Sequence, residues 1–161
     1  MKRQSEQNLL YSEIRFAPQL HTKKGLSQEE VVTAALKGRQ KYFDELRQKE
    51  NIKEGDIPSF YSNIILCCMR GNGNERENEE TIRIAAEFLS DSDGVVAVDL
   101  AGAEALFPTS DYEKLFAHAR AEGIPFTIHA GEAAGPESIR QAVDYGTARI
   151  GHGVNVYMIK I

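Results

Sequence analysis

The sequence contains no tryptophan and only two cysteines. It also has no apolar stretch long enough to cross a membrane. Its first residues, MKRQSEQNLLYSE, also lack the apolar segment of a secretory signal peptide. Cys67 and Cys68 are adjacent, and neighbouring residues of a strand point to opposite faces. We therefore expect two buried, reduced thiols rather than a disulfide or a shared metal site. Together these absences predict a soluble, cytoplasmic protein.

Positive charge is also in short supply. Lys and Arg number 19 against 24 Asp and Glu, which gives a net charge of −5. Nucleic-acid binding depends on Lys and Arg side chains that neutralise phosphates, so the charge favours a small-molecule ligand over a nucleic-acid partner. Phosphate loops of the GxGxxG or GxxxxGKS kind are absent. The run Gly71-Asn72-Gly73-Asn74 has different spacing and is predicted to be an ordinary loop.

Short apolar stretches rich in β-branched residues alternate with segments of helical periodicity. Strands are predicted at residues 9–18, 60–70, 95–102, 124–131 and 148–154. Helices are predicted at residues 27–46, 78–90, 110–123 and 135–146. Ser27 and Glu30 have the spacing of a capping box at the start of the first helix. A chain of 161 residues falls in the single-domain range, so we expect one domain over 1–161.

This alternation of strands and helices predicts an α/β fold whose strands are parallel and joined by right-handed crossovers. The strands are nearly all apolar, as expected when both faces of a sheet are covered. Two architectures fit the pattern: a doubly wound open sheet, which no glycine-rich phosphate loop favours here, and part of an eight-stranded barrel.

Unusual residues stand at the ends of three successive predicted strands. They are Asp99, Gly102 and Glu104 at the end of the third strand, His129 and Glu132 at the end of the fourth, and His152 at the end of the fifth. Each has an ordinary structural explanation when taken singly; Glu132, for example, would suit the N-terminus of the following helix. In parallel α/β folds, however, the ends of successive strands meet at one rim, where functional groups gather. Their coincidence therefore favours an active site.

The residue types indicate the chemistry. Neutral imidazole is a good zinc ligand, and a catalytic zinc lowers the pKa of its bound water to about 7. A nearby carboxyl group such as Glu132 can shuttle protons, and a second histidine can orient or deprotonate the water. This combination favours metal-assisted hydrolysis.

Five motifs occur in order between about residue 9 and residue 154: SEIRFAP (12–18), LCCMR (66–70), VDLAGAE (98–104), TIHAGE (127–132) and RIGHG (149–153). Together they resemble the adenosine deaminases, which are zinc-dependent barrel enzymes. The resemblance implies a partial TIM (β/α)8 barrel of about five parallel strands, equivalent to the second to sixth of eight. Arg15 and the cysteine pair fall in these motifs without a catalytic role, and we expect them to be structural.

The resemblance also implies roles for individual residues. His129 matches a zinc ligand, and Glu132 matches the acid that protonates the purine ring at N1. His152 matches the histidine that orients and activates the zinc-bound water, and Gly102 matches a glycine whose backbone N–H faces the purine N3. The implied reaction is the hydrolytic deamination of adenosine or deoxyadenosine to inosine or deoxyinosine and ammonia.

Two features of the family are missing from this sequence: a His-x-His zinc pair on the first strand and a late Asp-Asp strand end. His21 and His118, expected in a loop and a helix, match no ligand position. We therefore expect an incomplete Zn²⁺ site, weak zinc binding and little or no deamination by the isolated chain. A full barrel needs about 250 residues, and residues 155–161 form an atypical tail, as a truncated or frameshifted gene would leave.

Three interpretations follow. The first is a segment of an adenosine deaminase, completed by a complementing fragment. The second is a non-catalytic remnant that folds and self-associates through its open sheet edges without turnover. The third is an unrelated metal-free protein in which His129 and Glu132 contact a ligand directly.

Overall fold

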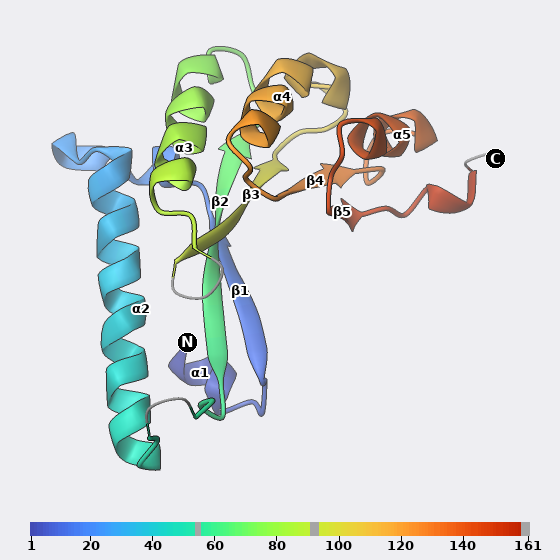
Figure 1. The fold of residues 1–161 in the computed structure, drawn as a ribbon. Helices are drawn as coiled ribbons and strands as arrows, with labels where there is room; N and C mark the ends of the chain where they lie inside the picture. Colours follow the sequence, from blue (N-terminus) through green and yellow to red (C-terminus); the bar gives the residue numbers. More distant parts are fainter. Residues whose placement is uncertain (54–55, 91–93, 159–161) are drawn as a thin grey trace.

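The computed structural model describes residues 1–53, 56–90 and 94–158. Its sheet has five parallel strands in the order β1-β2-β3-β4-β5. They are β1 (Tyr11–Phe16), β2 (Tyr61–Met69), β3 (Val95–Ala101), β4 (Phe126–Ala130) and β5 (Arg149–His152). This sequential order is that of a barrel, whereas a doubly wound sheet reverses direction at its switch point. The sheet curls into a half-barrel (Figure 1), which confirms the predicted partial (β/α)8 architecture.

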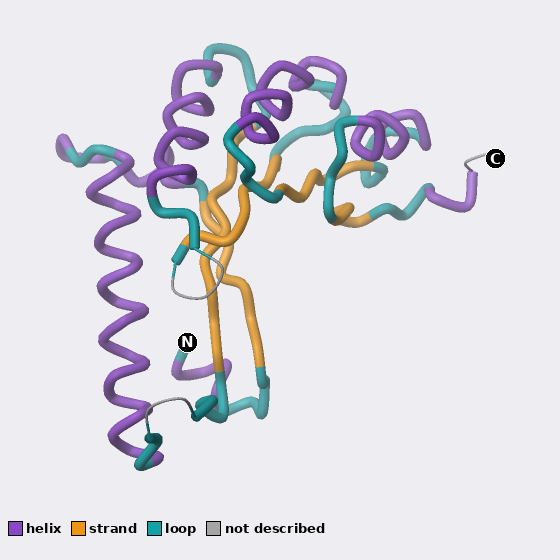
Figure 2. The backbone as a smooth tube through the Cα atoms, viewed as in Figure 1, coloured by secondary structure: helices purple, strands orange, loops and turns teal. Residues whose placement is uncertain are grey.

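Helices join successive strands and lie on the outer side of the curled sheet (Figures 1 and 2). The main helices are α2 (Gln28–Glu50), α3 (Glu75–Glu87), α4 (Glu113–Ala121) and α5 (Pro136–Asp144). The shorter elements are α1 (Lys2–Ser5) and the 3-10 helices η1 (Pro18–His21), η2 (Lys23–Gly25), η3 (Thr109–Tyr112) and η4 (Val156–Met158). Within the described ranges, none of the helices combines the length and the apolarity needed to cross a membrane.

A side-chain cap marks the start of α2, whereas α3 begins without one. The Ser27 hydroxyl accepts from the Glu30 N–H at 3.1 Å, and the Ser27 N–H donates to the Glu30 carboxylate at 2.8 Å. The predicted capping box of α2 is therefore confirmed. Helix α3 begins at Glu75, three residues before the predicted start at residue 78. Asn78 therefore lies within the helix, and its side chain both donates to and accepts from the Met69 backbone at the end of β2.

The hydrophobic core lies between the helices and the outer face of the sheet. Its largest fully buried apolar side chains include Ile64, Leu66, Ile82, Phe116 and Ile128. This apolar layer positions the strand ends, and a second, smaller cluster is formed by Phe43, Leu46 and Phe60.

The adjacent cysteines point to opposite faces of β2, as predicted. Cys67 Sγ lies 3.8 Å from Asp99 Oδ2 on the inner face, and Cys68 Sγ lies 3.8 Å from the Asn78 carbonyl on the helix side. Both thiols are free. Burial raises the pKa of both, that of Cys67 to about 12. Neither thiol is ionised near neutral pH, so neither is a reactive nucleophile.

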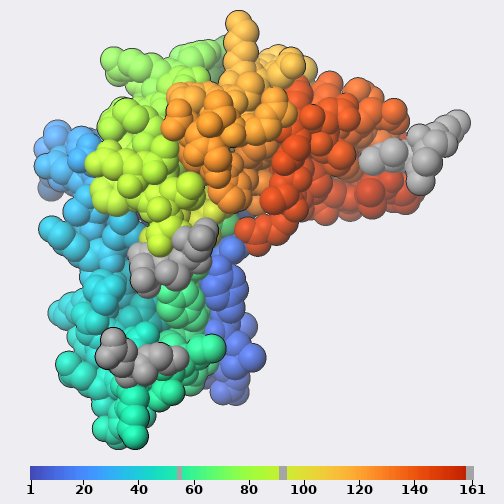
Figure 3. Space-filling view, viewed as in Figure 1, coloured from blue at the N-terminus to red at the C-terminus, as the bar shows by residue number. Residues whose placement is uncertain are grey.

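The inner face of the half-barrel is charged and open. Arg149 Nη1 on β5 lies 2.6 Å from Glu13 Oε2 on β1, so the two outer strands are linked across the interior. The concave side is visible in Figure 3 as a notch between the blue β1 and the orange-red β4 and β5. A cavity of about 430 Å³ is lined there by Glu13, Arg15, Ile65, Asp99, Thr127, Arg149 and Ile150.

The structure corrects the prediction for His21 and describes part of the predicted tail at residues 155–161. His21 is the last residue of η1 rather than part of a loop, and its ring meets the edge of the Phe16 ring. Within the predicted tail 155–161, Asn155 packs against the loop after β4 and residues 156–158 form η4. Residues 159–161 lie outside the described part of the chain.

Candidate active site at the strand ends

His129, near the end of β4, is held between a carboxylate and a guanidinium. Its Nδ1 lies 2.9 Å from Oδ1 of the fully buried Asp99 on β3, and its Nε2 lies 2.6 Å from Nη1 of Arg15 on β1. Arg15 also pairs with Asp99 at 2.9 Å. Because an arginine can only donate and a carboxylate accepts, these partners assign the proton of His129 to Nδ1. Arg15, expected to be merely structural, therefore contacts the site directly.

Glu132 and His152 meet next to His129. His152 Nε2 lies 3.3 Å from Glu132 Oε2, and the His152 ring is 5.0 Å from the His129 ring in an edge-on arrangement. His152 adopts a φ of 63°, a left-handed conformation that few residues other than glycine take up. The three predicted side chains His129, Glu132 and His152 are thus brought together.

The helix-capping explanation of Glu132 does not match the structure. Helix α5 has Gly135 as its N-cap, and no side chain caps it. The side chain of Glu132 is 57% exposed and faces His152 instead. A ligand at this rim can therefore reach the carboxyl group.

Glu104 points away from the rim and under the loop that carries Glu132. It is 4% exposed and accepts hydrogen bonds from the backbone N–H groups of residues 131–134 and from the Ser138 hydroxyl. Burial by itself raises the pKa of Glu104, but the hydrogen bonds from Ser138 and the loop outweigh it and hold that pKa at about 2. Glu104 is therefore an internal anion that organises backbone.

Arg70, directly after β2, binds backbone carbonyl groups next to the same loop. It is buried, and its guanidinium donates to the carbonyl oxygens of His129 and Phe107, each at 2.7 Å. Gly102 packs against it with a φ of 118°, and a Cβ added there would lie 3.1 Å from Arg70 Cβ. The structure thus places Gly102 beside Arg70, at a backbone position that only glycine fits without strain.

Sequence reasoning missed Arg15 and Arg70 as site residues. Arg15 lies next to the last residue of β1, and Arg70 follows β2 directly. The rule that functional groups gather at the ends of parallel strands would have found both.

The residues of this chain do not by themselves fit a catalytic zinc ion. In the described ranges, no three or more His, Cys, Asp or Glu side chains are grouped so as to hold a metal ion. The Nε2 atom of His129 faces the positively charged Arg15. A catalytic zinc normally takes three protein ligands, and this chain offers one imidazole beside a cation.

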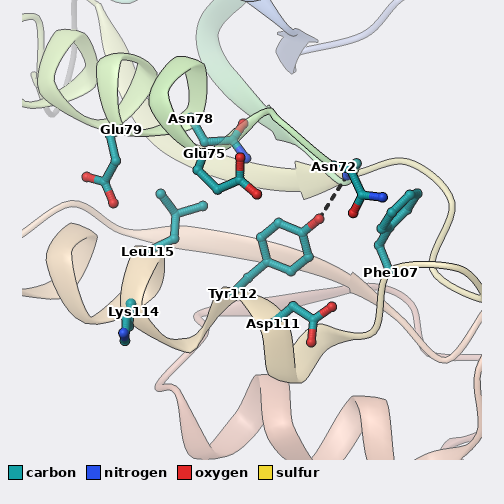
Figure 4. Close-up of a pocket in the computed structure, with 10 residues that line it drawn as sticks. Asn72, Glu75, Asn78, Glu79, Phe107, Asp111, Tyr112, Lys114 and Leu115 are labelled. Atoms are coloured by element: carbon teal, nitrogen blue, oxygen red, sulfur yellow. Dashed lines mark hydrogen bonds between the residues drawn. The ribbon is translucent and has the colours of Figure 1, made fainter.

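A second cavity, of about 250 Å³, lies between α3 and the η3–α4 segment (Figure 4). The Tyr112 ring projects into it, and its hydroxyl accepts from the Gly71 N–H at 2.9 Å. Glu75 and Asn78 face it from α3, and Lys114 from α4. His129, Glu132, His152 and Gly102 are not among its lining residues, so it is distinct from the rim site.

Replacing Gly151 tests how tightly His129 is confined. A Cβ at position 151 would lie 2.9 Å from His129 Nδ1, the atom that faces Asp99. We expect Gly151→Ala to push the ring off Asp99 and to destabilise the protein by about 1–3 kcal/mol. The ¹⁵N spectrum of labelled histidine and thermal unfolding measure both effects. Gly135→Ala, where nothing lies within 4 Å, is the control; an unchanged His129 signal in Gly151→Ala would contradict the packing described.

Comparison with known proteins gives the family. The sequence model of the family described as adenosine deaminase matches residues 1–158. The adenosine deaminase of Haemophilus ducreyi is 49% identical over 155 residues, covering 96% of this chain and 42% of that protein. The chain thus spans less than half the length of this relative.

Solved structures show the same fold. The adenine deaminase of Arthrobacter aurescens superimposes with a TM-score of 0.76 at 22% identity, covering 98% of this chain and 44% of that one. A zinc-bound amidohydrolase from Burkholderia ambifaria gives a TM-score of 0.75 at 21% identity, covering 94% and 38%. At these identities the likeness concerns the fold. Because the family match extends over nearly all of the chain, this protein belongs to the adenosine deaminase family.

Proposed function

We propose that this chain supplies the acid–base side of a site for the hydrolytic deamination of adenosine or deoxyadenosine to inosine or deoxyinosine and ammonia. The observation that carries the proposal is the meeting of Glu132 and His152 at 3.3 Å beside His129, on the rim of the half-barrel. Membership of the family and the 49% identity to an adenosine deaminase support it.

In this proposal each residue acts on a defined atom. Glu132, which is exposed at the rim, donates a proton to purine N1. His152 orients the attacking water and takes up its proton as the oxygen adds at C6. Gly102 offers its backbone N–H to N3. His152 then passes its proton to the C6 amino group, which leaves as ammonia, and the C6 hydroxyl returns a proton to Glu132 as the carbonyl forms. One water is consumed for each ammonia released.

His129 would be the contribution of this chain to a zinc site, with Asp99 fixing the Nδ1–H tautomer so that Nε2 carries the lone pair. The other ligands would have to come from outside these residues, so the steps above are assigned to side chains of this chain alone. The ligand is a small purine nucleoside, for which the concave cavity of about 430 Å³ offers room.

A chimera tests the proposal. Residues 9–154 would replace the matching segment of the Haemophilus ducreyi relative, and conversion of adenosine to inosine would be followed by ultraviolet absorbance with zinc present. We expect turnover within about tenfold of the parent enzyme. Glu132→Gln and His152→Ala in the chimera should each lower kcat by about 10²–10⁴-fold. Glu137→Gln, an exposed carboxylate on α5, should leave kcat unchanged.

The isolated chain is expected to bind zinc weakly and to deaminate little or nothing, because His129 is its single assigned ligand. Turnover by the isolated chain near that of the parent enzyme would contradict this. A folded chimera without turnover would instead support the second interpretation, a non-catalytic remnant that folds and self-associates.

A further inference from the structure

We propose that Glu104 is a positioning residue that fixes the loop 131–134 and thereby holds Glu132 against His152. This inference rests on the proposed function, because it gives Glu132 its importance. It does not require Glu104 to touch a substrate: the side chain is buried beneath the loop, on the side away from the rim.

The loop wraps around the Glu104 carboxylate. Oε1 accepts from the Gly131 N–H at 2.6 Å, and Oε2 accepts from the N–H groups of Glu132, Ala133 and Ala134 at 3.0, 2.8 and 3.1 Å. Four successive N–H groups aimed at one carboxylate form an anion-binding concavity of the kind called a nest. Because all four belong to the segment that carries Glu132, the anion determines the direction in which that segment leaves β4.

A series of hydrogen bonds between side chains also leads to the Glu104 carboxylate. The Ser138 hydroxyl donates to Glu104 Oε1 at 2.5 Å, so its proton is committed there. The 2.7 Å contact between the Thr109 and Ser138 hydroxyls then has Thr109 as the donor. Arg70 Nη2 in turn donates to Thr109 Oγ1 at 3.0 Å. Every hydrogen bond of the series is therefore donated in the direction of Glu104, and the series begins at the positively charged guanidinium of Arg70.

Carbonyl groups of the same segment are held as well. Arg70 Nη2 also donates to the carbonyl of His129, immediately before the loop. The Asn155 side chain donates to the carbonyl groups of Gly131 and Ala134 at 3.2 and 2.9 Å. The backbone from His129 to Ala134 is thus held on both its N–H and its C=O sides, while the Glu132 side chain itself is exposed.

The negative charge is the decisive property of Glu104. A carboxylate accepts on both oxygens, whereas a glutamine amide would turn an NH₂ group toward N–H donors. Glu104→Gln has nearly the same shape and should nevertheless release the loop. Glu104→Asp keeps the charge on a shorter side chain, so we expect it to restore the loop in part. Glu137→Gln removes a carboxylate from the first turn of the following helix without touching the loop amides and is the matched control.

The test on the intact chain combines the amide signals of the loop with the side-chain cross-peaks between Glu132 and His152. Amides that donate to a carboxylate resonate downfield, and amide hydrogen exchange reports their protection. In Glu104→Gln we expect residues 131–134 to lose the downfield shift and about ten- to a hundredfold of protection, and the cross-peaks between the Glu132 side chain and the His152 ring to disappear. Glu137→Gln should keep both signals, and Glu104→Asp should recover part of them.

A third measurement links the loop to catalysis. In the chimera, Glu104→Gln should lower kcat by about 10²-fold with little change in KM, as expected when a catalytic group is displaced by about 1 Å. Loss of the amide signals with intact Glu132–His152 cross-peaks would overturn the positioning role. A parent chimera without turnover would refute the proposed function alone, because the cross-peaks decide the positioning role without it.

Should Glu104→Gln fail to fold, Ser138→Ala removes one donor and should weaken the same signals; unchanged signals there would also count against the proposal.

Discussion

Glu104→Gln should lower the free energy of unfolding by about 3 kcal/mol at neutral pH, and its difference from the wild-type chain should vanish as the pH falls toward 2. The reason is the shift of the pKa of Glu104 from 4.5 to about 2, in which hydrogen bonds from Ser138 and the loop N–H groups outweigh the opposing effect of burial. Because the pKa is lower in the folded chain, the stabilisation is complete above pH 4.5. It is lost as the pH falls from there to about 2.

Urea unfolding followed by circular dichroism between pH 7 and pH 2 measures this. Other carboxylates titrate in the same range, so the informative quantity is the difference between the two proteins at each pH. Glu137→Gln replaces an exposed carboxylate of the following helix and should give a difference near zero throughout. A Glu104→Gln difference that stayed constant between pH 4.5 and pH 2 would show that the ionised carboxylate is not what stabilises the loop.

Gly131→Ala should destabilise the protein by about 3 kcal/mol, for two separable reasons. Gly131 has a φ of 75°, where an L-residue costs about 1–2 kcal/mol. A Cβ there would also lie 2.6 Å from Ile139 Cγ1, and relieving such an overlap costs about 1–3 kcal/mol. The substitution should displace the loop as well, because Gly131 provides the first N–H to Glu104.

Gly146→Ala isolates the first reason. Gly146 has a φ of 87° and nothing within 4 Å of an added Cβ, so only the backbone strain of about 1–2 kcal/mol should appear. The second reason is tested with Ile139→Ala, which alone removes buried side-chain volume. In the Gly131→Ala background its effect should be smaller, since the new methyl group fills part of the space. Strict additivity of the two changes in thermal unfolding would argue against the overlap.

Most of the secondary structure could be predicted because its causes are local. The five apolar stretches become the five strands with boundaries shifted by up to two residues, and the capping box at Ser27 marks the start of α2. Local pattern failed at the start of α3, which begins at Glu75 without a side-chain cap, while the Asn78 side chain contacts the end of β2. Such a contact joins segments that the sequence pattern treats separately.

The sequence was enough to predict which residues stand at the strand ends, but not where their side chains point. The strand-end rule selects His129, Glu132 and His152, and the structure brings these side chains together. The rule also selects Glu104, but it cannot tell whether a carboxylate faces a ligand or a loop. The rule would also place Arg15 at the rim, but it cannot show that this side chain reaches across the sheet to His129, 114 residues away in the sequence.

The sequence by itself therefore determined the alternation of strands and helices, the opposite faces of the two cysteines and the residues that stand at the strand ends, because these follow from backbone periodicity. The tertiary structure alone decided the direction of the long charged side chains. Arg15, Arg70 and Glu104 each have several rotatable bonds, and each settles where donors and acceptors from other segments of the chain satisfy its charge. Those partners come together only when the sheet has curled.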